Sequence, residues 1–252
     1  RTEQQLKGVR SADLVHPDDV IRIIQLRDKL LTGSTDRVHT VLRYRSFGSY
    51  PSRHVTGSLV RDAASAAKFF VITLGDIVAD AQLAATAAHD KGAAVIAFTN
   101  PGGIRADILG KADGTVTYAD LFASQPFRNQ LVTLTLTGAQ IKTALEQQWL
   151  DPSRPRILQV SHGFSYAWDS AKPFGERVIA ARMTLDGQPI DPAKSYRVTV
   201  NNYLSVGGDG FTAFKDGTAA RYGIYDVDAL FAYFKANSPV APGQAQRILR
   251  VN

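Results

Sequence analysis

The stretch AAVIAFTNPGGIR, residues 93–105, decides how the rest of the chain is interpreted. Residues 93–98 are apolar without interruption, which predicts a strand covered on both faces of a sheet. Pro101 and Gly102 follow, and they suit the two central positions of a type II turn. Proline fixes φ at the first position, and glycine allows a positive φ at the second. We therefore expect a buried strand that ends abruptly in a tight turn.

Polar groups surround this turn. Gly103 leaves the backbone bare, so that a ligand can approach it closely, and Asn100 and Arg105 flank it with an amide and a planar guanidinium. The pattern has two interpretations. In the first, the stretch is a structural strand end with a surface arginine, because turns of this kind are common. In the second, the strand delivers polar groups to a ligand pocket.

Helical and strand patterns alternate along the rest of the chain. Threonine at every second position of 131–137 predicts a strand with its threonines on one face. The expected fold class is α+β, with mixed sheets packed with helices in mixed α/β layers. Helices are predicted over residues 74–89, 117–122, 139–149 and 227–234, and further strands over residues 158–160, 164–168, 177–185, 195–201 and 247–251, with a hairpin turn at Asp186-Gly187.

The first part of the chain is less regular. Residues 13–31 predict an amphipathic helix that begins with acidic residues, and residues 38–42 and 54–60 predict two strands joined by a loop. Residues 37–59 also carry basic and aromatic side chains, so nucleic-acid binding is one interpretation of this stretch. A solvated loop is favoured instead, because arginines among serines are common in such loops.

Composition excludes several classes of site. The chain has no cysteine, which excludes disulfides, thiolate catalysis and cysteine-bound metals. Its five histidines are dispersed, so we predict no metal site. The net charge is +6, but the lysines and arginines are scattered, which favours anionic ligands and does not indicate nucleic acid. Apolar runs are short and the chain starts with RTEQQLKGVR, so we expect no membrane-spanning helix and no signal peptide.

A second glycine-rich loop follows the strand predicted over residues 195–201. It contains Tyr203, Gly208 and Asp209, and Phe127 follows a predicted helix in a similar way. Aromatic rings offer flat faces for stacking a nucleobase, and an aspartate in a glycine turn can accept hydrogen bonds from paired sugar hydroxyls. Each residue also has a structural interpretation, which is core packing for the rings and an Asx turn for the aspartate.

Three motifs together resemble a known family. They are NPGGIRAD at 100–107, YADLFASQPF at 118–127 (followed by LVTLTLTG) and NNYLSVGGDGF at 201–211. In order and spacing, these motifs and LGDIVADAQL are similar to the C-terminal domain of the bacterial 5′-nucleotidase / UDP-sugar hydrolase family. The resemblance implies that residues 55–252 form a 5′-nucleotidase C-terminal-like substrate-binding domain. Residues 1–54 would then hold a connector helix and a less defined segment.

The resemblance also implies a role for each site residue. A nucleobase would lie between Phe127 and Tyr203, with Asn100 near the base. Arg105 would face the ribose or the phosphate, and Asp209 would bind the ribose hydroxyls. The glycines that let the loops close around the ligand are Gly102, Gly103, Gly207 and Gly208. The implied ligand is therefore a nucleoside or nucleotide.

In this family, a separate N-terminal metallophosphatase domain carries out hydrolysis, and two divalent metal ions there polarise the phosphate and activate a water molecule. The signatures of that domain are absent from this chain, in which Gly75-Asp76 falls within a predicted helix. We therefore expect no catalytic residue, no metal and no cofactor here, and a chain that by itself binds and does not hydrolyse. Joined to its metallophosphatase domain, it would be part of a periplasmic or secreted hydrolase.

Two alternative functions are a stand-alone nucleotide-binding or adhesin-like module, and the substrate domain of a relative that acts on a non-nucleotide ester. The chain also departs from the family pattern in three places. Residues 70–73 replace the usual Gly-Glu-Ser, residues 37–53 have no counterpart, and Arg128 stands where glycine is common. Arg128 could stack on the base, clamp a phosphate or obstruct the pocket.

Overall fold

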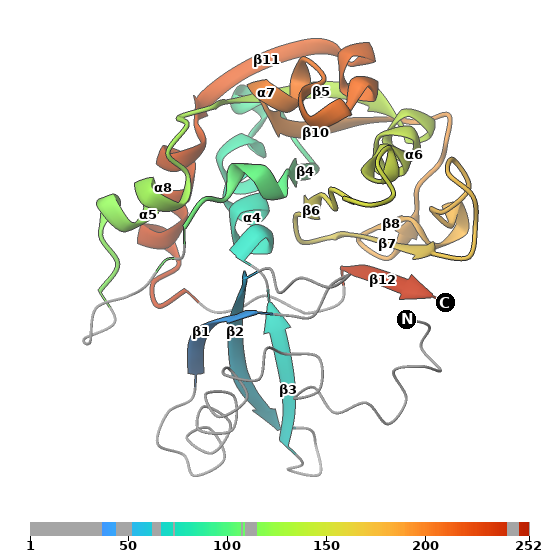
Figure 1. Ribbon diagram of the computed structural model, residues 1–252. Helices are drawn as coiled ribbons and strands as arrows, with labels where there is room; N and C mark the ends of the chain where they lie inside the picture. The colour runs from blue at the N-terminus through green and yellow to red at the C-terminus, as the bar shows by residue number, and fades with distance from the viewer. Residues whose placement is uncertain are drawn as a thin grey trace. The chain divides into compact units, whose positions relative to one another are not determined.

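The computed structural model divides the chain into two compact units, Arg1–Leu74 and Gly75–Asn252. It describes residues 37–43, 52–61, 67–72, 74–106, 108, 115–240 and 247–251 (Figure 1). The helix predicted over residues 13–31 lies outside the described residues. The domain boundary expected at residue 55 stays a prediction.

The first unit contains a three-stranded antiparallel sheet in the order β1-β2-β3. Strand β1 spans Arg37–Arg43, β2 spans Ser52–Arg61, and β3 spans Ala67–Ile72. The first two strands confirm the pair predicted from the sequence. The third strand, with the sequence AKFFVI, was not predicted, because periodicity alone does not distinguish a short apolar run in a strand from one in a helix.

A five-stranded mixed sheet forms the centre of the second unit, in the order β11-β5-β10-β4-β6. Strand β10 runs parallel to β4 and antiparallel to β5, and β11 and β6 are the two edges. The carboxyl ends of β4 and β10 and the amino end of β5 therefore lie side by side, where these three strands of the sheet begin or end. The bounds are Ile96–Thr99 for β4, Gln130–Thr137 for β5, Gln159–Val160 for β6, Ser195–Asn201 for β10 and Thr218–Tyr225 for β11.

The alternating sequence of β5 explains how the two faces of this sheet are covered. Leu134 and Leu136 point into the main hydrophobic core. Thr133 occupies the other face, where its hydroxyl lies 2.8 Å from that of Thr199 on β10. The Thr199 hydroxyl lies in turn 2.7 Å from that of Thr86, the last residue of helix α4 (Leu74–Thr86). The predicted threonine face is thus confirmed, and it joins the sheet to α4.

The leucine face carries helix α6 (Gly138–Glu146), the 3₁₀ turn η3 (Gln147–Trp149) and a second sheet in the order β12-β7-β8-β9. Phe98 of β4 meets Phe164 of β7 edge to face, with ring centroids 5.4 Å apart. Mixed sheets packed with helices confirm the predicted fold class. The strands of this second sheet are β7 (Phe164–Asp169), β8 (Thr184–Leu185), β9 (Gln188–Pro189) and β12 (Ile248–Val251).

Local signals start the helices of this unit. The side chain of Thr117 caps α5 (Tyr118–Ser124) by accepting a hydrogen bond from the backbone N–H of Asp120. The carboxylate of Asp120 accepts in turn from the backbone N–H of Thr117. Gly138 has to be glycine, because a Cβ there would collide with the carbonyl of Asp191. The remaining helical segments are η1 (His89–Lys91), η2 (Pro101–Gly103), η4 (Ala180–Arg182), α7 (Asn202–Ser205), η5 (Gly208–Gly210), η6 (Thr212–Asp216) and α8 (Asp226–Ala236).

Three predictions of secondary structure need correction, and one further strand was missed. The strand expected over residues 93–98 is β4, which begins at Ile96 and ends at Thr99. The stretch 177–185 is not one strand, because η4 interrupts it between a single bridge at Val178 and β8. Helix α4 ends at Thr86 rather than at residue 89, where the chain turns into η1. Strand β11 was missed, since its side chains are almost all exposed and its sequence shows no alternation.

A buried ion pair ties α4 to the end of the chain. Arg247 donates from two nitrogens to the two carboxylate oxygens of Asp80, at 2.7 and 2.8 Å. Arg247 also donates to the carbonyl of Val160 at 2.9 Å, and the backbone of His162 donates to Asp80 at 2.6 Å. Such a pair is strongly destabilising when only one partner is removed, because the other charge stays buried.

Candidate functional site

The two loops singled out by sequence lie at the edge where β4 and β10 end. Asn100 follows β4 directly, Asn201 is the last residue of β10, and Phe127 comes three residues before β5 begins. Ligands of α/β sheets commonly bind outside the carboxyl ends of strands. We call Asn100, Arg105, Phe127, Asn201, Tyr203 and Asp209 the strand-end site.

Asn100 is the centre of the hydrogen bonding in this site. Its side chain is buried, with 3% exposure, and its Nδ2 donates to Oδ2 of Asp209 at 2.7 Å. Its Oδ1 accepts from Nδ2 of Asn201 at 3.0 Å. The two loops, separated by more than 100 residues in the sequence, are thus joined through one amide.

The turn after Asn100 is a 3₁₀ turn, so the predicted type II turn is wrong. Gly103 donates its backbone N–H to the carbonyl of Asn100 at 3.0 Å, and the φ of Gly102 is not in the positive range. Gly103 instead allows a close approach, because a Cβ there would lie 3.3 Å from Oδ1 of Asn100. A Cβ at Gly102 would lie 3.6 Å from Oδ2 of Asp209, which is an ordinary contact.

Asp209 is held from several sides. Its φ of 56° lies in the left-handed region, which is uncommon outside glycine and which aspartate adopts more readily than most residues. Tyr203 donates its hydroxyl to Oδ1 of Asp209 at 3.1 Å and accepts from the Asp209 backbone N–H at 3.1 Å. Arg156 donates to the Asp209 carbonyl at 3.1 Å, and its Nε lies 3.9 Å from Oδ1.

The ring of Tyr203 rests on the glycine loop. A Cβ on Gly208 would lie 2.5 Å from two ring atoms of Tyr203, so a larger residue at 208 would displace the ring. Gly207, in front of it, has a φ of 86°. Tyr203 is nevertheless 46% exposed, which leaves part of its ring free to meet a ligand.

Arg105 and Phe127 come together on the other side of the site. The guanidinium of Arg105 lies 5.7 Å from the ring centroid of Phe127, within the range of a cation–π contact. The backbone N–H of Arg105 donates to the carbonyl of Ser124 at 2.8 Å, which fixes this segment on α5. Phe127 is 56% exposed, so its alternative interpretation as a core residue does not hold.

Arg128 does not enter any hydrogen bond of the strand-end site that the structure shows. Its guanidinium lies 4.7 Å from the ring centroid of Tyr225, at the end of β11. Its φ of 50° is left-handed, the backbone conformation that favours glycine. This geometry explains why glycine suits the position in the family that the sequence resembles.

Sequence reasoning missed two members of the hydrogen-bonded cluster. Asn201 caps α7 by accepting from the backbone of Leu204 at 2.8 Å, a role that the Asn-Asn pair after a strand could have indicated. Arg156 comes from the loop DPSRPR, about 50 residues from Asp209, and nothing in that loop indicates a site.

Metal-binding groups do not gather in the part of the chain that the structure describes. No three side chains of histidine, aspartate or glutamate come close enough there to hold an ion. Within the same described ranges, no helix is long and apolar enough to cross a membrane.

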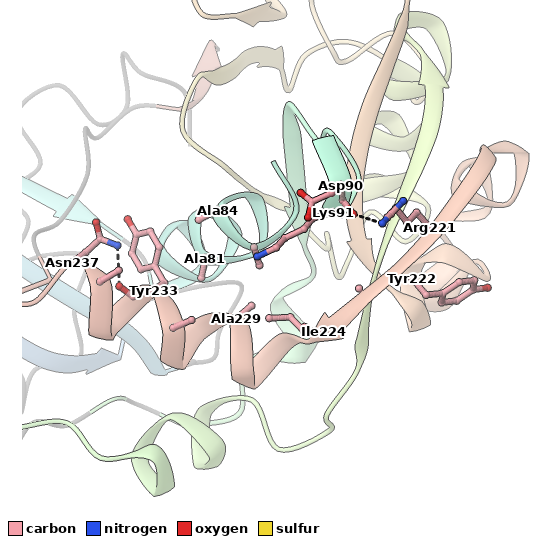
Figure 2. Close-up of a pocket in the computed structure, with 14 residues that line it drawn as sticks. Ala81, Ala84, Asp90, Lys91, Arg221, Tyr222, Ile224, Ala229, Tyr233 and Asn237 are labelled. Carbon is pink, nitrogen blue, oxygen red and sulfur yellow. Dashed lines mark hydrogen bonds between the residues drawn. The ribbon is translucent and has the colours of Figure 1, made fainter. Parts of the chain in front are cut away.

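A separate hollow lies on the threonine side of the sheet (Figure 2). It has a volume of about 490 Å³ and is lined by α4, η1, β11 and α8. Figure 2 shows Ala81 and Ala84 of α4 across from Ala229 of α8, with Arg221 donating to the carbonyl of Asp90 at one end. We call this hollow the alanine groove. It shares no residue with the strand-end site.

Known proteins match the part of the chain that contains the strand-end site. The family model described as 5′-nucleotidase, C-terminal domain, matches residues 55–216. An apyrase of Tabanus yao is 33% identical over 61% of this chain and 29% of its own length. The cell wall protein Lmo0130 of Listeria monocytogenes is 35% identical over 64% of this chain and 21% of its own length. The chain thus spans less than a third of these relatives.

A solved structure agrees with the fold. The 5′-nucleotidase precursor of Thermus thermophilus has a TM-score of 0.62 and 26% identity to this chain. The alignment covers 85% of this chain and 54% of that one. The Thermus sulfate thiohydrolase SoxB, with a TM-score of 0.52 and 17% identity, shares the fold alone.

Proposed function

Because the chain belongs to the 5′-nucleotidase C-terminal domain family, we propose that its strand-end site binds the nucleoside part of a nucleotide. The observation that carries this proposal is the hydrogen-bonded chain from Asn201 through Asn100 to Asp209 and Tyr203. It brings the two motif loops together at the edge of a sheet, where ligands of such folds bind.

The side chains of the site suit a nucleoside. Phe127 and Tyr203 are both exposed, and stacking of a base on an aromatic ring contributes about 1–3 kcal/mol. Asp209 offers a carboxylate to the ribose hydroxyls, and Asn100 holds that carboxylate in place. Arg105, exposed beside Phe127, provides a cation for the ribose or the phosphate.

We place hydrolysis outside this chain. Joined to an N-terminal metallophosphatase domain, the chain would supply substrate specificity to an enzyme that cleaves nucleotide phosphate esters. Two divalent metal ions in that domain would activate the attacking water. In this proposal, the chain by itself binds and does not hydrolyse.

An exported location, periplasmic or secreted, fits this assignment. One relative is a cell wall protein by name, which supports a role outside the cytoplasm. UDP-sugars are a further substrate class for the same pocket. A stand-alone nucleotide-binding module is the competing function, and the coding sequence upstream of Arg1 distinguishes it from an enzyme subdomain.

Calorimetry on this chain tests the proposal. Adenosine, AMP and UDP-glucose are titrated in turn, and at least one nucleoside or nucleotide should bind. Asn100→Ala removes the donor to Asp209 and the acceptor for Asn201, so the affinity should fall about tenfold or more.

The matched control is Asn237→Ala, which changes an exposed asparagine of the alanine groove and should leave the affinity unchanged. Absence of heat with all three ligands would overturn the proposal. So would an Asn100→Ala variant that binds as tightly as the parent chain.

A further inference from the structure

We infer that the Tyr203 hydroxyl is a positioning group that holds Asp209 toward the ribose, so that the site selects nucleosides with both the 2′- and 3′-hydroxyls. The inference rests on the proposed function and concerns the hydroxyl, beyond the stacking role of the ring. Tyr203 and Asp209 are six residues apart and close a small loop through their side chains.

The hydroxyl makes two bonds to one residue. It accepts from the backbone N–H of Asp209 and donates to Oδ1 of the same residue, both at 3.1 Å. The first bond fixes where the Asp209 backbone lies, and the second fixes the direction of its carboxylate. A phenylalanine at position 203 would keep the ring and lose both bonds.

Asp209 lies in a tightly turned loop, whose backbone alone does not fix the direction of the carboxylate. Its φ is 56°, and those of Gly207 and Gly210 are 86° and 88°, so most of this short loop is in a conformation that glycine favours. Arg156 holds the Asp209 carbonyl at 3.1 Å, but its Nε is 3.9 Å from the carboxylate. The carboxylate direction therefore depends on Tyr203 and Asn100.

The carboxylate keeps room for a sugar. Asn100 occupies one acceptor position on Oδ2 and Tyr203 occupies one on Oδ1, whereas a carboxylate offers about four such positions in all. One position remains on each oxygen, and the side chain is 20% exposed. Two neighbouring hydroxyls can donate to the two oxygens, which matches the 2′,3′-diol of a ribose.

This arrangement couples the two halves of ligand recognition. The ring of Tyr203 meets the base, and its hydroxyl sets the group that meets the sugar. Loss of the hydroxyl should therefore weaken only the part of binding that comes from the sugar hydroxyls. A hydroxyl that merely stabilises the loop would, when lost, weaken every nucleoside equally.

The experiment compares adenosine with 2′,3′-dideoxyadenosine, which keeps the base and lacks the diol. Calorimetry gives the ratio of the two affinities for the parent chain and for Tyr203→Phe. The parent chain should bind adenosine about tenfold more tightly. In Tyr203→Phe, the affinity for adenosine should fall about fivefold, whereas the affinity for dideoxyadenosine should change by less than twofold.

Two further variants complete the test. Tyr222→Phe changes an exposed tyrosine of the alanine groove and should leave both affinities unchanged. Asp209→Asn should abolish the preference for the diol. In the double variant Asp209→Asn with Tyr203→Phe, the ratio of the affinities for adenosine and dideoxyadenosine should be the same as in Asp209→Asn. Thermal melting of each variant shows that it is folded.

The outcomes separate the inference from the function on which it rests. A parent chain that binds neither compound overturns the proposed function. A parent chain that binds both equally, or a Tyr203→Phe variant that weakens both to the same extent, leaves nucleoside binding in place and overturns the inference.

Discussion

The alanine groove is an open hollow of about 490 Å³ whose lining mixes alanines with charged, amide and tyrosine side chains, whereas the strand-end site consists of polar and aromatic side chains bonded to one another. In the groove, alanines of α4 and α8 face each other, and Arg221 donates to the carbonyl of Asp90 at one end (Figure 2). In the strand-end site, one aspartate receives bonds from an asparagine, a tyrosine and an arginine.

The hollow and the hydrogen-bonded cluster therefore occupy different regions of this molecule. A hollow offers space, but a ligand is oriented by polar groups held at defined positions. A set of polar side chains held at fixed distances can select one, even where the surface is shallow.

The largest expected effect is on the wall of the groove. Arg247→Met leaves the Asp80 carboxylate buried without its partner, which should lower the free energy of unfolding by about 3–5 kcal/mol. Asp80 precedes Ala81, a residue that lines the groove. Burial, and next the charge of Asp80, raise the pKa of Tyr233, which also lines the groove. Urea unfolding measures the change.

The control for that experiment is the double variant Asp80→Asn with Arg247→Met, which removes both charges and should recover part of the loss. At temperatures where Arg247→Met is folded, its affinity for nucleoside should equal that of the parent. A loss of unfolding free energy below about 1 kcal/mol would contradict the assigned role of the pair.

A second effect depends on pH and involves the helix that forms the other wall. Burial raises the pKa of Asp226, the first residue of α8, from 3.8 to about 6. The folded state therefore holds this proton more tightly than the unfolded chain does. The stabilisation is complete below about pH 3.8 and is lost as the pH rises through about 6, a change of about 3 kcal/mol.

Asp226→Asn should remove this part of the pH dependence, so that its unfolding free energy differs from that of the parent in slope between pH 4 and 7. Asp216→Asn, at an exposed carboxylate, is the matched control and should keep the parent slope. Identical slopes for the parent and Asp226→Asn would show that Asp226 does not titrate in this window.

A third and smaller effect concerns Arg128, which connects the two regions. It follows Phe127 of the strand-end site and stacks on Tyr225, the residue before α8. Arg128→Gly relieves a left-handed φ that costs about 1–2 kcal/mol in a residue with a side chain. Two effects of the substitution destabilise the folded state. The cation–π contact, worth about 0.5–1 kcal/mol, is lost, and the greater conformational entropy of glycine stabilises the unfolded chain by a similar amount.

These contributions nearly cancel, so thermal unfolding should show a change within about 0.5 kcal/mol. Nucleoside affinity should stay within twofold, because Arg128 is held on Tyr225 and not in the site. A tenfold gain in affinity for Arg128→Gly would show instead that this arginine obstructs the pocket.

Some of this fold could be predicted from sequence because local patterns decide it. The alternation of leucine and threonine in β5 predicts a strand with two different faces, and both faces are found. Thr117 and Asp120 predict the start of α5 in the same way. The exposed strand β11 carries no such pattern, and only its pairing with β5 makes it a strand.

The geometry around the residues named from the sequence could not be predicted, and their role in binding stays a prediction. Proline followed by two glycines predicted a turn, but the same residues suit both a type II turn and the 3₁₀ turn that is found. Sequence spacing contains no information on a contact between residues 109 positions apart. Arg156 could not be found at all, because its role exists only once the loop at Asp209 is folded.

The measurement that tests the central claim most directly is hydrogen exchange of the chain with and without AMP. We predict slower exchange in peptides covering residues 100–106, 125–130 and 201–211, where amides of Gly103, Arg105 and Asp209 are bonded within the strand-end site. Peptides covering residues 81–91 and 221–237 of the alanine groove should be unchanged. Protection confined to the groove peptides would contradict the proposed function, because it would place the nucleotide in the hollow and not at the strand ends.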